Sequence, residues 1–365
     1  MKLVTIIGAR PQFIKAAPIS RLLRAKQGVR EIIVHTDQHY DHNMSDVFFK
    51  ELEIPIPDYN LGIGSGTHGI QTGRMLEAIE KVLLNEKPDR VLVYGDTNTT
   101  LAGALASVKL CIPVAHVEAG LRSCNLRMPE EINRILTDHI SDLLFAPTET
   151  AVQNLRKEGL PEEQIHLVGD VMYDAALYYA AKAKCTSHIL EQLDLKPQEY
   201  ILATIHRAEN TDDPLKLKAI FGGLIEASAN IPIVLPLHPR TRLALHTQGL
   251  IEETGKNLLL IEPIGYLDMA MLEQNAKLIV TDSGGVQKEA FFYRVPCVTL
   301  RHETEWVELV ELGWNHLIAP VSAEIVAAGI SMKYNSQQST VGSCYGDGRA
   351  ANQIVDCLIQ GSTAL

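Results

Sequence analysis

The chain has 365 residues, of which 46% are hydrophobic and 21% are charged. This composition is typical of a globular protein and excludes disordered and collagen-like chains, and the length predicts about two domains. The 33 Lys and Arg residues against 44 Asp and Glu residues give a formal net charge of −11. This balance argues against a nucleic-acid polymer as partner, because phosphate contacts need clustered cations, but it leaves room for one local basic pocket.

The sequence also bears on the compartment. No stretch reaches the roughly 18 consecutive apolar residues that a membrane span needs. The first residues carry one Lys and a short apolar run before Arg10, a pattern unlike a secretory signal peptide. The 6 cysteines are scattered without a Cys-x-x-Cys pair, which is typical of a reducing compartment. We therefore expect a cytoplasmic protein with no membrane span.

Short apolar runs alternate with helical periodicity along the first half of the chain. Helices are predicted at residues 11–26 and 71–87, after residue 96, and from Pro129 onward. Strands are predicted at residues 3–7, 31–35, 90–94, 113–117, 143–146 and 165–168.

The same alternation continues in the second half. A helix over residues 170–196 connects the halves, and another is predicted at residues 348–358. Strands are predicted at residues 200–205, 231–237, 258–261, 278–281 and 297–300. This rhythm predicts an α/β fold with two Rossmann-like domains that face a cleft. We expect the first domain at residues 1–169, joined by the C-terminal helix 348–365, and the second at residues 170–347.

A glycine-rich segment resembles a dinucleotide-binding loop. Gly64-Ser-Gly66-Thr-His-Gly69 matches the pattern G-x-G-x-x-G, which requires a strand directly before it. Pro55, Pro57 and Asp58 precede the segment instead. A flexible glycine loop is therefore the favoured interpretation.

A second pattern has to be examined as a possible metal site. His35, His39 and His42, with Asp41, stand at spacings of three or four residues. They complete no recognised zinc signature, so we expect no metal.

Two cations follow the first predicted strand. Arg10 lies in the loop after it, and Lys15 lies about one turn into the next helix. Ligands of open α/β sheets bind outside the carboxyl ends of the strands, and two cations beside a helix N-terminus suit a phosphate. Simple surface positions are the alternative.

A second junction of strand, turn and helix lies at Thr281–Glu289. Ser283, Gly284 and Gly285 would let backbone N–H groups approach an anion closely. A plain tight turn capped by Ser283 is the alternative. Glu289 follows on the same side of the helix, where its carboxylate could accept two ribose hydroxyls.

Several carboxylates are predicted at one sheet edge. Asp96 and Glu118 each end a strand, and Glu130 and Glu131 begin a helix. Such groups serve in general acid–base chemistry when burial or like charge raises a pKa, while caps and surface ion pairs are the alternative.

Two histidines of the second half stand at similar places. His206 and His238 each follow a predicted strand. A single histidine is usually structural, but two at strand ends that face a cleft favour a functional role.

These residues belong to motifs that resemble a known family. The motifs are, in order, Gly8-Ala-Arg10-Pro, Gly95-Asp96-Thr-Asn-Thr, His116-Val-Glu118-Ala-Gly-Leu-Arg122, Pro129-Glu130-Glu131-Ile-Asn133-Arg134, Thr204-Ile-His206-Arg207-Ala-Glu209-Asn210 and Asp282-Ser283-Gly284-Gly285-Val-Gln287-Lys-Glu289. Together they closely resemble the non-hydrolysing UDP-N-acetylglucosamine 2-epimerases over nearly the whole chain. The resemblance implies the GT-B-type arrangement of two Rossmann-like domains, in agreement with the alternation of elements.

The resemblance implies roles in the first domain. Arg10 and Lys15 would contact the phosphate or sugar of a UDP-sugar. Asp96, Glu118 and Glu130 would be the acid–base carboxylates.

It also implies roles in the second domain. His206 would act at the diphosphate, together with the Ser283–Gly285 turn. Glu289 would hold the uridine ribose, Met269 would lie near the uracil, and Arg301 would lie near the nucleotide.

Two departures from the family pattern suggest a subgroup. Thr36-Asp37-Gln38-His39 stands where the family often has Thr-Gly-Gln-His, and Thr304-Glu305-Trp306-Val307-Glu308 stands where it often has Thr-Glu-Arg-Pro-Glu. The family arginine is thus replaced by Trp306. The combination resembles enzymes that epimerise UDP-2,3-diacetamido-2,3-dideoxyglucuronic acid for O-antigen synthesis.

The resemblance thus implies an isomerase that inverts C2 of a UDP-2-acetamido sugar. Elimination of UDP would give a glycal, two carboxylates would exchange the C2 proton on opposite faces, and UDP would add back. This chemistry requires neither a redox cofactor nor a metal. A homodimer is also implied. Conversion of UDP-N-acetylglucosamine to UDP-N-acetylmannosamine, a GT-B glycosyltransferase and a non-catalytic nucleotide-sugar sensor are the alternatives.

Overall fold

The chain forms two compact units. The computed structural model describes residues 1–38, 53, 56–334 and 344–360. The first unit comprises Met1–Ala175 and Ser343–Leu365, and the second comprises Ala176–Gly342. The structure thus divides the chain after Ala175, within a helix, where the sequence suggested residue 169.

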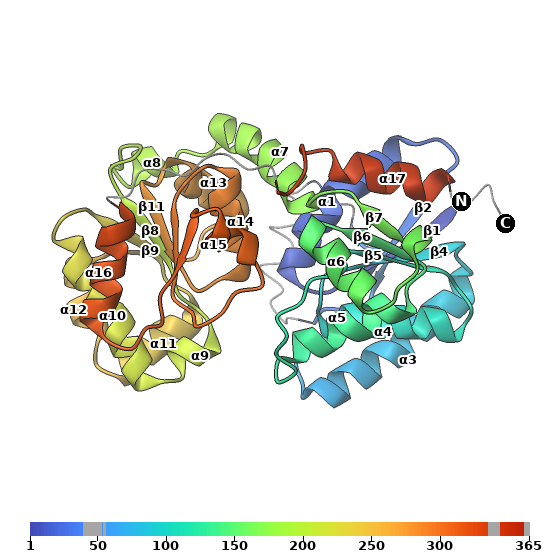
Figure 1. Ribbon diagram of the computed structural model, residues 1–365, viewed down its shortest axis with the longest axis horizontal. Helices are drawn as coiled ribbons and strands as arrows, with labels where there is room; N and C mark the ends of the chain where they lie inside the picture. Colours follow the sequence, from blue (N-terminus) through green and yellow to red (C-terminus); the bar gives the residue numbers. More distant parts are fainter. Residues whose placement is uncertain (39–52, 54–55, 335–343, 361–365) are drawn as a thin grey trace. The chain divides into compact units, whose positions relative to one another are not determined.

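The first unit is built on a parallel sheet of seven strands in the order β3-β2-β1-β4-β5-β6-β7 (Figure 1). The strands are β1 (Lys2–Ile7), β2 (Arg30–His35), β3 (Tyr59–Asn60), β4 (Arg90–Tyr94), β5 (Val114–Val117), β6 (Leu143–Ala146) and β7 (Ile165–Leu167). The order reverses between β1 and β4, which pair directly. The loops after these two strands therefore flank the switch point, where open α/β sheets bind their ligands.

Helices cover both faces of this sheet (Figure 1). They are α1 (Arg10–Ala25), α3 (His68–Glu86), α4 (Asn98–Lys109), α5 (Pro129–Ile140), α6 (Glu149–Lys157) and α17 (Ala350–Gln360), while α7 (Val171–Thr186) begins in this unit and continues into the second. Met75 and Ile79 of α3 pack on Val4 and Val91 of the sheet. On the other face α17 packs against α1, and the Asp174 carboxylate accepts the first N–H groups of α17.

The second unit repeats this topology. Its six parallel strands follow the order β10-β9-β8-β11-β12-β13. They are β8 (Ile201–Thr204), β9 (Ile233–Pro236), β10 (Leu259–Ile261), β11 (Leu278–Thr281), β12 (Cys297–Thr299) and β13 (Asn315–Leu317). The switch point lies between β8 and β11, whose Thr204 and Thr281 are in register.

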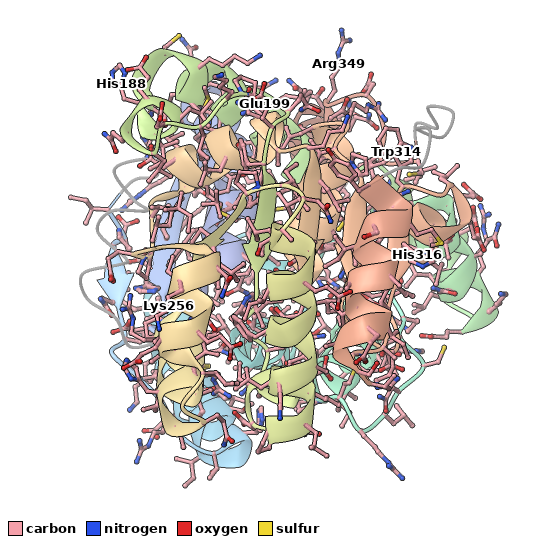
Figure 2. All side chains as sticks on the ribbon, turned by 90° about the vertical axis from the view of Figure 1, so that its left-hand side faces the viewer. His188, Glu199, Lys256, Trp314, His316 and Arg349 are labelled. Carbon is pink, nitrogen blue, oxygen red and sulfur yellow. The ribbon has the colours of Figure 1, made fainter. Side chains whose placement is uncertain are left out.

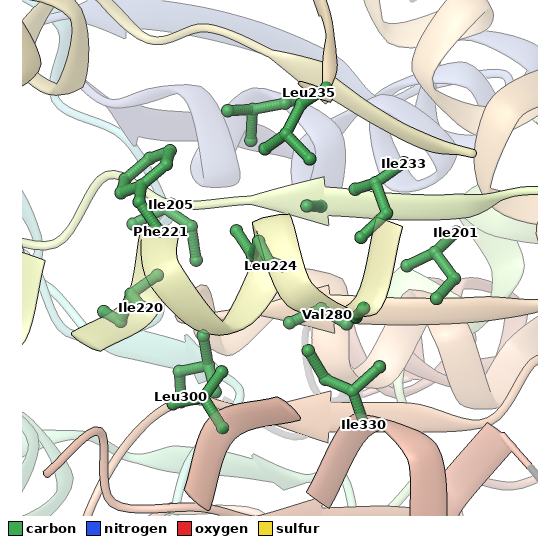
Figure 3. Close-up of a cluster of buried hydrophobic side chains, with 14 of the residues drawn as sticks. Ile201, Ile205, Ile220, Phe221, Leu224, Ile233, Leu235, Val280, Leu300 and Ile330 are labelled. Atoms are coloured by element: carbon green, nitrogen blue, oxygen red, sulfur yellow. The ribbon is translucent and has the colours of Figure 1, made fainter. Parts of the chain in front are cut away.

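The second unit has one large core on each face of its sheet. Its helices are α8 (Ile189–Gln192), α9 (Ala208–Thr211), α10 (Pro214–Ser228), α11 (Pro239–Thr247), α12 (Ile251–Asn257), α13 (Tyr266–Asn275), α14 (Gly284–Phe292), α15 (Val307–Glu311) and α16 (Ala323–Tyr334). Phe221 and Leu224 of α10 and Ile330 of α16 pack on Ile201 and Val280 of the strands (Figure 3). Leu272 of α13 and Ala290 of α14 belong to the core on the other face.

The predicted alternation of strands and helices is confirmed in both units, with three differences. The edge strands β3 and β13 were missed, because runs of 2 and 3 residues are too short for a pattern. Figure 2 labels Trp314, directly before β13, and His316, within it. The helix predicted over residues 170–196 ends at Thr186 and is followed by the short α8. Within the described ranges, no helix is long and apolar enough to cross a membrane.

Candidate active site

The switch point of the first unit is organised by Gln12. Its Oε1 accepts the backbone N–H groups of Gly8 and Ala9 at 2.8 and 3.0 Å. Its Nε2 donates to the carbonyl of Tyr94 at 2.9 Å and to Thr100 Oγ1 at 3.0 Å. One buried amide thus joins the ends of β1 and β4 and fixes the turn that leads into α1, which carries Lys15, and the loop that carries Asp96.

Lys15 and Glu118 form a buried ion pair at this point. Lys15 comes from α1, and Glu118 follows β5 with a left-handed φ of 73°. A non-glycine residue seldom adopts this conformation, which directs the carboxylate to the lysine here. Gly95 completes the arrangement, since a Cβ there would lie 3.0 Å from Lys15 Nζ and 3.1 Å from Glu118 Oε2.

Asp96 is held beside this pair by an arginine. Its Oδ2 lies 2.5 Å from Nη1 of the buried Arg134. The side chain keeps 33% of its surface exposed, yet the protein packed around the carboxyl raises its pKa above the ordinary value of an aspartate. Arg134 and Lys15 oppose this rise, and the nearby charges of Glu118 and Glu130 add to it. Asp96 is therefore an accessible carboxyl that keeps its proton to a higher pH than usual.

Glu130 and its neighbour Glu131 have different surroundings. Glu131 is buried, and its carboxylate accepts the backbone N–H groups of Ser123 and Cys124 and two bonds from Arg134. Burial alone would raise the pKa of Glu131, but the Ser123 N–H and the Arg134 guanidinium bring it below the ordinary value. Glu131 therefore fixes the loop after β5, whereas the half-buried Glu130 keeps its carboxylate near Asp96.

Arg10 is the first residue of α1. Its side chain lies outside the described part of the structure, so its predicted contact with phosphate stays a prediction.

In the second unit a buried carboxylate organises the switch point. Asp282 follows β11 and is fully buried. It accepts the backbone N–H groups of His206 and Arg207 at 3.0 Å and the Asn210 side-chain N–H at 3.1 Å. The loop after β8 is thereby fixed, and the His206 ring stays 41% exposed, with its centroid 5.6 Å from that of His238.

The turn after Asp282 leads into α14. Ser283 is the N-cap residue, but its hydroxyl makes no capping hydrogen bond, so the simple-cap alternative does not describe it. Gly285 is exposed, and a Cβ there would meet only Ser283 Oγ, at 4.0 Å. A Cβ on Gly284 would lie 2.6 Å from Glu305 Oε1. A Cβ at position 284 would therefore displace the end of the Glu305 side chain, whereas the protein leaves open space for one at position 285.

Glu305 and Arg301 lie beside this helix start. Arg301 is buried, and its Nη1 is 3.0 Å from Glu305 Oε2. A second carboxylate, that of Glu209, lies 3.7 Å from Arg301 Nε. The guanidinium is thus a cation held between two acidic side chains next to the N-terminus of α14.

Farther along α14, Glu289 is held in place. It is buried, and the hydroxyl of Tyr266 donates to its Oε1 at 3.0 Å. Met269 lies on α13, as Tyr266 does, and is partly buried against the core below. The Glu289 carboxylate thus has a fixed orientation at one end of α13.

Trp306, which the resemblance places at the position of a family arginine, covers a buried cation. Lys288 Nζ lies 4.0 Å from the centre of the Trp306 ring, and both side chains are almost fully buried. A desolvated cation–π contact of this kind contributes about 2 kcal/mol. The Trp306 ring is therefore held against a lysine of α14.

Two other sequence patterns can be assessed. The segment Gly64–Gly69 follows the edge strand β3, whereas dinucleotide loops follow the first strand at the switch point. Among the described residues, no group of three or more His, Cys, Asp and Glu side chains could hold a metal ion. His39, Asp41 and His42 lie outside the described residues.

A family model described as UDP-N-acetylglucosamine 2-epimerase matches residues 21–359. The chain belongs to this epimerase family. The predicted α/β class with two Rossmann-like domains is confirmed, and the protein is an isomerase that acts on UDP-sugars. Arg10 and Lys15 precede the residues matched by the family model.

Relatives of the epimerase cover its full length. It is 56% identical to a "UDP-N-acetylglucosamine 2-epimerase homolog" of Methanococcus maripaludis, over 98% of this chain and 99% of the relative. It is 54% identical to the UDP-2,3-diacetamido-2,3-dideoxy-D-glucuronate 2-epimerase of Pseudomonas aeruginosa, over the same shares. The crystal structure of Methanocaldococcus jannaschii UDP-GlcNAc 2-epimerase with UDP-GlcNAc and UDP matches with a TM-score of 0.92 at 48% identity, covering 99% of this chain and 100% of that one.

Several residues of the candidate site were given no role of their own from the sequence. Arg134 holds Asp96, Asp282 holds the His206 loop, and Tyr266 orients Glu289. Only Arg134 left a local signal, because it stands one helical turn after Glu131 and such pairs share a helix face. The other partners lie tens of residues apart in the chain and become visible only in the fold.

Proposed function

We propose that this epimerase inverts C2 of a UDP-2-acetamido sugar, from the gluco to the manno configuration, without hydrolysing it. The observation that carries the proposal is the switch point of the first unit, where two carboxylates stand beside two cations. Direct deprotonation at C2 has no adjacent carbonyl to take up the charge. Departure of UDP from C1 solves this problem, because the electron pair then leaves with the diphosphate.

The residues of the first unit exchange the C2 proton in this proposal. One carboxylate takes the proton as the C1–O bond breaks, which gives a glycal and free UDP. A second carboxylate returns a proton to the opposite face, and the UDP oxygen bonds to C1 again. The raised pKa of Asp96 suits the donor, and Glu118, in its ion pair with Lys15, is placed as the base. Glu130 is the third candidate.

The residues of the second unit bind UDP in this proposal. The N-terminus of α14 at Ser283, Gly284 and Gly285 offers N–H groups and a partial positive charge to the departing diphosphate. His206, held at the end of β8, donates to the same phosphates. Glu289, oriented by Tyr266, accepts the ribose hydroxyls.

For the sugar itself we propose UDP-2,3-diacetamido-2,3-dideoxyglucuronic acid, used for a surface polysaccharide such as O-antigen. The 54% identity with the Pseudomonas enzyme supports it, as do the changed segments around Asp37 and Trp306. UDP-N-acetylglucosamine is the second candidate, supported by the 48% identical Methanocaldococcus enzyme. We further propose that the protein is cytoplasmic and forms a homodimer. Sedimentation of the purified chain would test the dimer.

The test is epimerisation in deuterated water with both UDP-sugars in parallel, followed by NMR. We expect deuterium at C2 of the manno product, slow release of free UDP, and faster conversion of the diacetamido uronate. Product without deuterium at C2 would contradict the elimination route. Faster conversion of UDP-N-acetylglucosamine would overturn the substrate assignment alone.

The two rival functions give different results in the same tube. A glycosyltransferase would transfer the sugar to an added acceptor without exchange at C2. A nucleotide-sugar sensor would bind UDP and exchange nothing. The carboxylates beside cations in the first unit favour the epimerase over both.

A further inference from the structure

A buried histidine and aspartate lie beneath the proposed acid–base groups. His116 is in β5 and Asp138 is in α5, and both side chains are fully buried. His116 Nδ1 lies 2.7 Å from Asp138 Oδ1. Neither residue reaches the surface, so neither touches a substrate directly.

The other ring nitrogen of His116 reaches the loop of Asp96. Its Nε2 lies 2.7 Å from the carbonyl oxygen of Gly95, the residue before Asp96. A carbonyl and a carboxylate only accept hydrogen bonds, so this geometry calls for an N–H on each ring nitrogen, which only the imidazolium form carries. Gly95 has φ +64° and makes room for Lys15 and Glu118, so the turn held by His116 also shapes the space of that ion pair.

The other oxygen of Asp138 reaches the loop of Glu118. It accepts the backbone N–H of Gly120 at 3.1 Å and a bond from Arg122 Nη1 at 2.8 Å. Gly120 cannot be replaced without a shift of the backbone, because a Cβ there would lie 2.4 Å from the carbonyl oxygen of Ala151. Asp138 thus fixes the backbone two residues after Glu118.

The charges around the pair agree with an ionised Asp138. Burial alone would raise the pKa of this carboxyl, but the hydrogen bond from His116 and the charge of Arg122 bring it below its ordinary value. Arg122 is held in turn by two bonds to Glu158, at 2.7 and 2.8 Å.

We propose that His116 and Asp138 are positioning residues that set the distance and orientation between Asp96 and Glu118. The pair joins the loop of Asp96 to the loop of Glu118, because His116 bonds the Gly95 carbonyl and Asp138 bonds the Gly120 N–H. The inference rests on the proposed function, in which those two carboxylates exchange the C2 proton. Misplacement of an acid–base group by about 1 Å lowers a rate roughly a hundredfold without a loss of substrate contacts.

Two substitutions of His116 each keep one of its two hydrogen bonds, the one to Asp138 or the one to Gly95. His116→Asn places an amide N–H near Nδ1 and keeps the bond to Asp138, and His116→Gln places one near Nε2 and keeps the bond to Gly95. We expect both to lower kcat for C2 exchange at least tenfold, with KM and the Kd for UDP within about twofold of the wild type. A folded variant of either kind with kcat within twofold would overturn the proposal.

Two control variants separate positioning from stability. His188→Gln alters an exposed histidine of the second unit, 3.5 Å from Glu191, and should leave kcat unchanged. Leu83→Ala opens a cavity in the α3 core of the same unit and should lower the melting temperature at unchanged kcat. A matching loss of kcat in Leu83→Ala would attribute the His116 effect to stability and overturn the proposal.

A spectroscopic measurement separates this inference from the proposed function. In wild-type protein labelled with ¹⁵N-histidine, His116 should show hydrogen on both ring nitrogens, and Asp138→Asn should change that signal. A single protonated nitrogen would overturn the link whatever the activity. A wild type that shows both N–H groups but exchanges no C2 hydrogen would count against the proposed function instead.

Discussion

The two switch points share one topology and differ in chemistry. In both units the strand order reverses between two paired parallel strands, and the loops after those strands lie at one sheet edge. In the first unit this edge carries Asp96 and Glu118, each beside a cation. In the second unit the buried Asp282 accepts backbone N–H groups, and a glycine helix start follows it. The same sheet edge therefore presents titratable side chains in one unit and backbone donors in the other.

This difference teaches how one fold can serve two tasks. A proton transfer needs carboxyl groups whose pKa is set by their neighbours, and salt-bridged partners supply that control. A diphosphate needs several N–H donors in a fixed array, and an ordered helix N-terminus supplies them. The topology fixes where the loops meet, and the residues at the strand ends decide what they do there.

The contrast between the two switch points is tested most directly at Asp96. Asp96→Asn removes a proton carrier but keeps a hydrogen bond to Arg134, which also stays paired with Glu131. We expect kcat for C2 exchange to fall about 10²–10⁴-fold, the range of general acid–base catalysis, at an unchanged Kd for UDP. Single-turnover NMR and calorimetry measure the two quantities.

Asp89→Asn is the matched control for Asp96→Asn. Asp89 precedes β4 at the opposite end of the same strand, where its Oδ2 accepts the Lys2 N–H at 2.6 Å. It should leave kcat unchanged. Full turnover by Asp96→Asn would remove this carboxylate from the proton-transfer role.

Gly285 tests the other side of the comparison. Gly285→Ala adds a methyl group where the protein leaves open space, and alanine suits a helix better by about 0.5–1 kcal/mol. We therefore expect an equal or higher melting temperature together with at least a tenfold weaker affinity for UDP. Calorimetric titration with UDP and thermal unfolding give both numbers.

Gly284→Ala serves as the contrasting variant. Its Cβ would lie 2.6 Å from Glu305 Oε1, so we expect it to lower the stability as well as the UDP affinity. Unchanged UDP binding by a stable Gly285→Ala would place the diphosphate away from this helix start.

The positions of these groups could be predicted because parallel strands end at a common edge. Asp96, Glu118 and Ser283 each follow a predicted strand, and the alternation of elements was enough to place them there. The partners of these residues could not be predicted in this way. Asp282 holds the N–H of His206 only because β8 and β11 pair, although the two residues are 76 positions apart in the chain.

The packing partners were hidden for a second reason. His116 lies within an apolar strand motif, and Asp138 lies on the following helix. A sequence pattern assigns each to an element but does not show that both side chains meet beneath two loops. The same holds for Trp306, whose neighbour Lys288 lies on α14 and became recognisable only from their contact.

The two units also differ in how their buried carboxylates are partnered. This difference gives the smallest predicted effect, a change of stability with pH. Asp138 and Glu131 of the first unit have charged partners that lower their pKa values. Glu273 of the second unit is buried, and neither of its oxygens has a hydrogen-bond partner among the described residues. Burial, followed by the charge of Glu289, raises the pKa of Glu273 well above its ordinary value of 4.5.

This raised pKa makes the stability of the second unit fall as the pH rises above the ordinary value of 4.5. Below the ordinary value Glu273 is protonated in both states, and its contribution to stability is complete. As the pH rises, the unfolded chain loses this proton first, so the folded state loses stability by at most about 1.4 kcal/mol per pH unit until the folded group ionises too. Glu273→Gln carries no such proton and should gain about 1 kcal/mol over the wild type between pH 5 and pH 6, measured by urea unfolding. The exposed Glu252→Gln of α12 should show no such slope, and a stability difference between Glu273→Gln and wild type that stays flat with pH would show that Glu273 is ionised inside the protein.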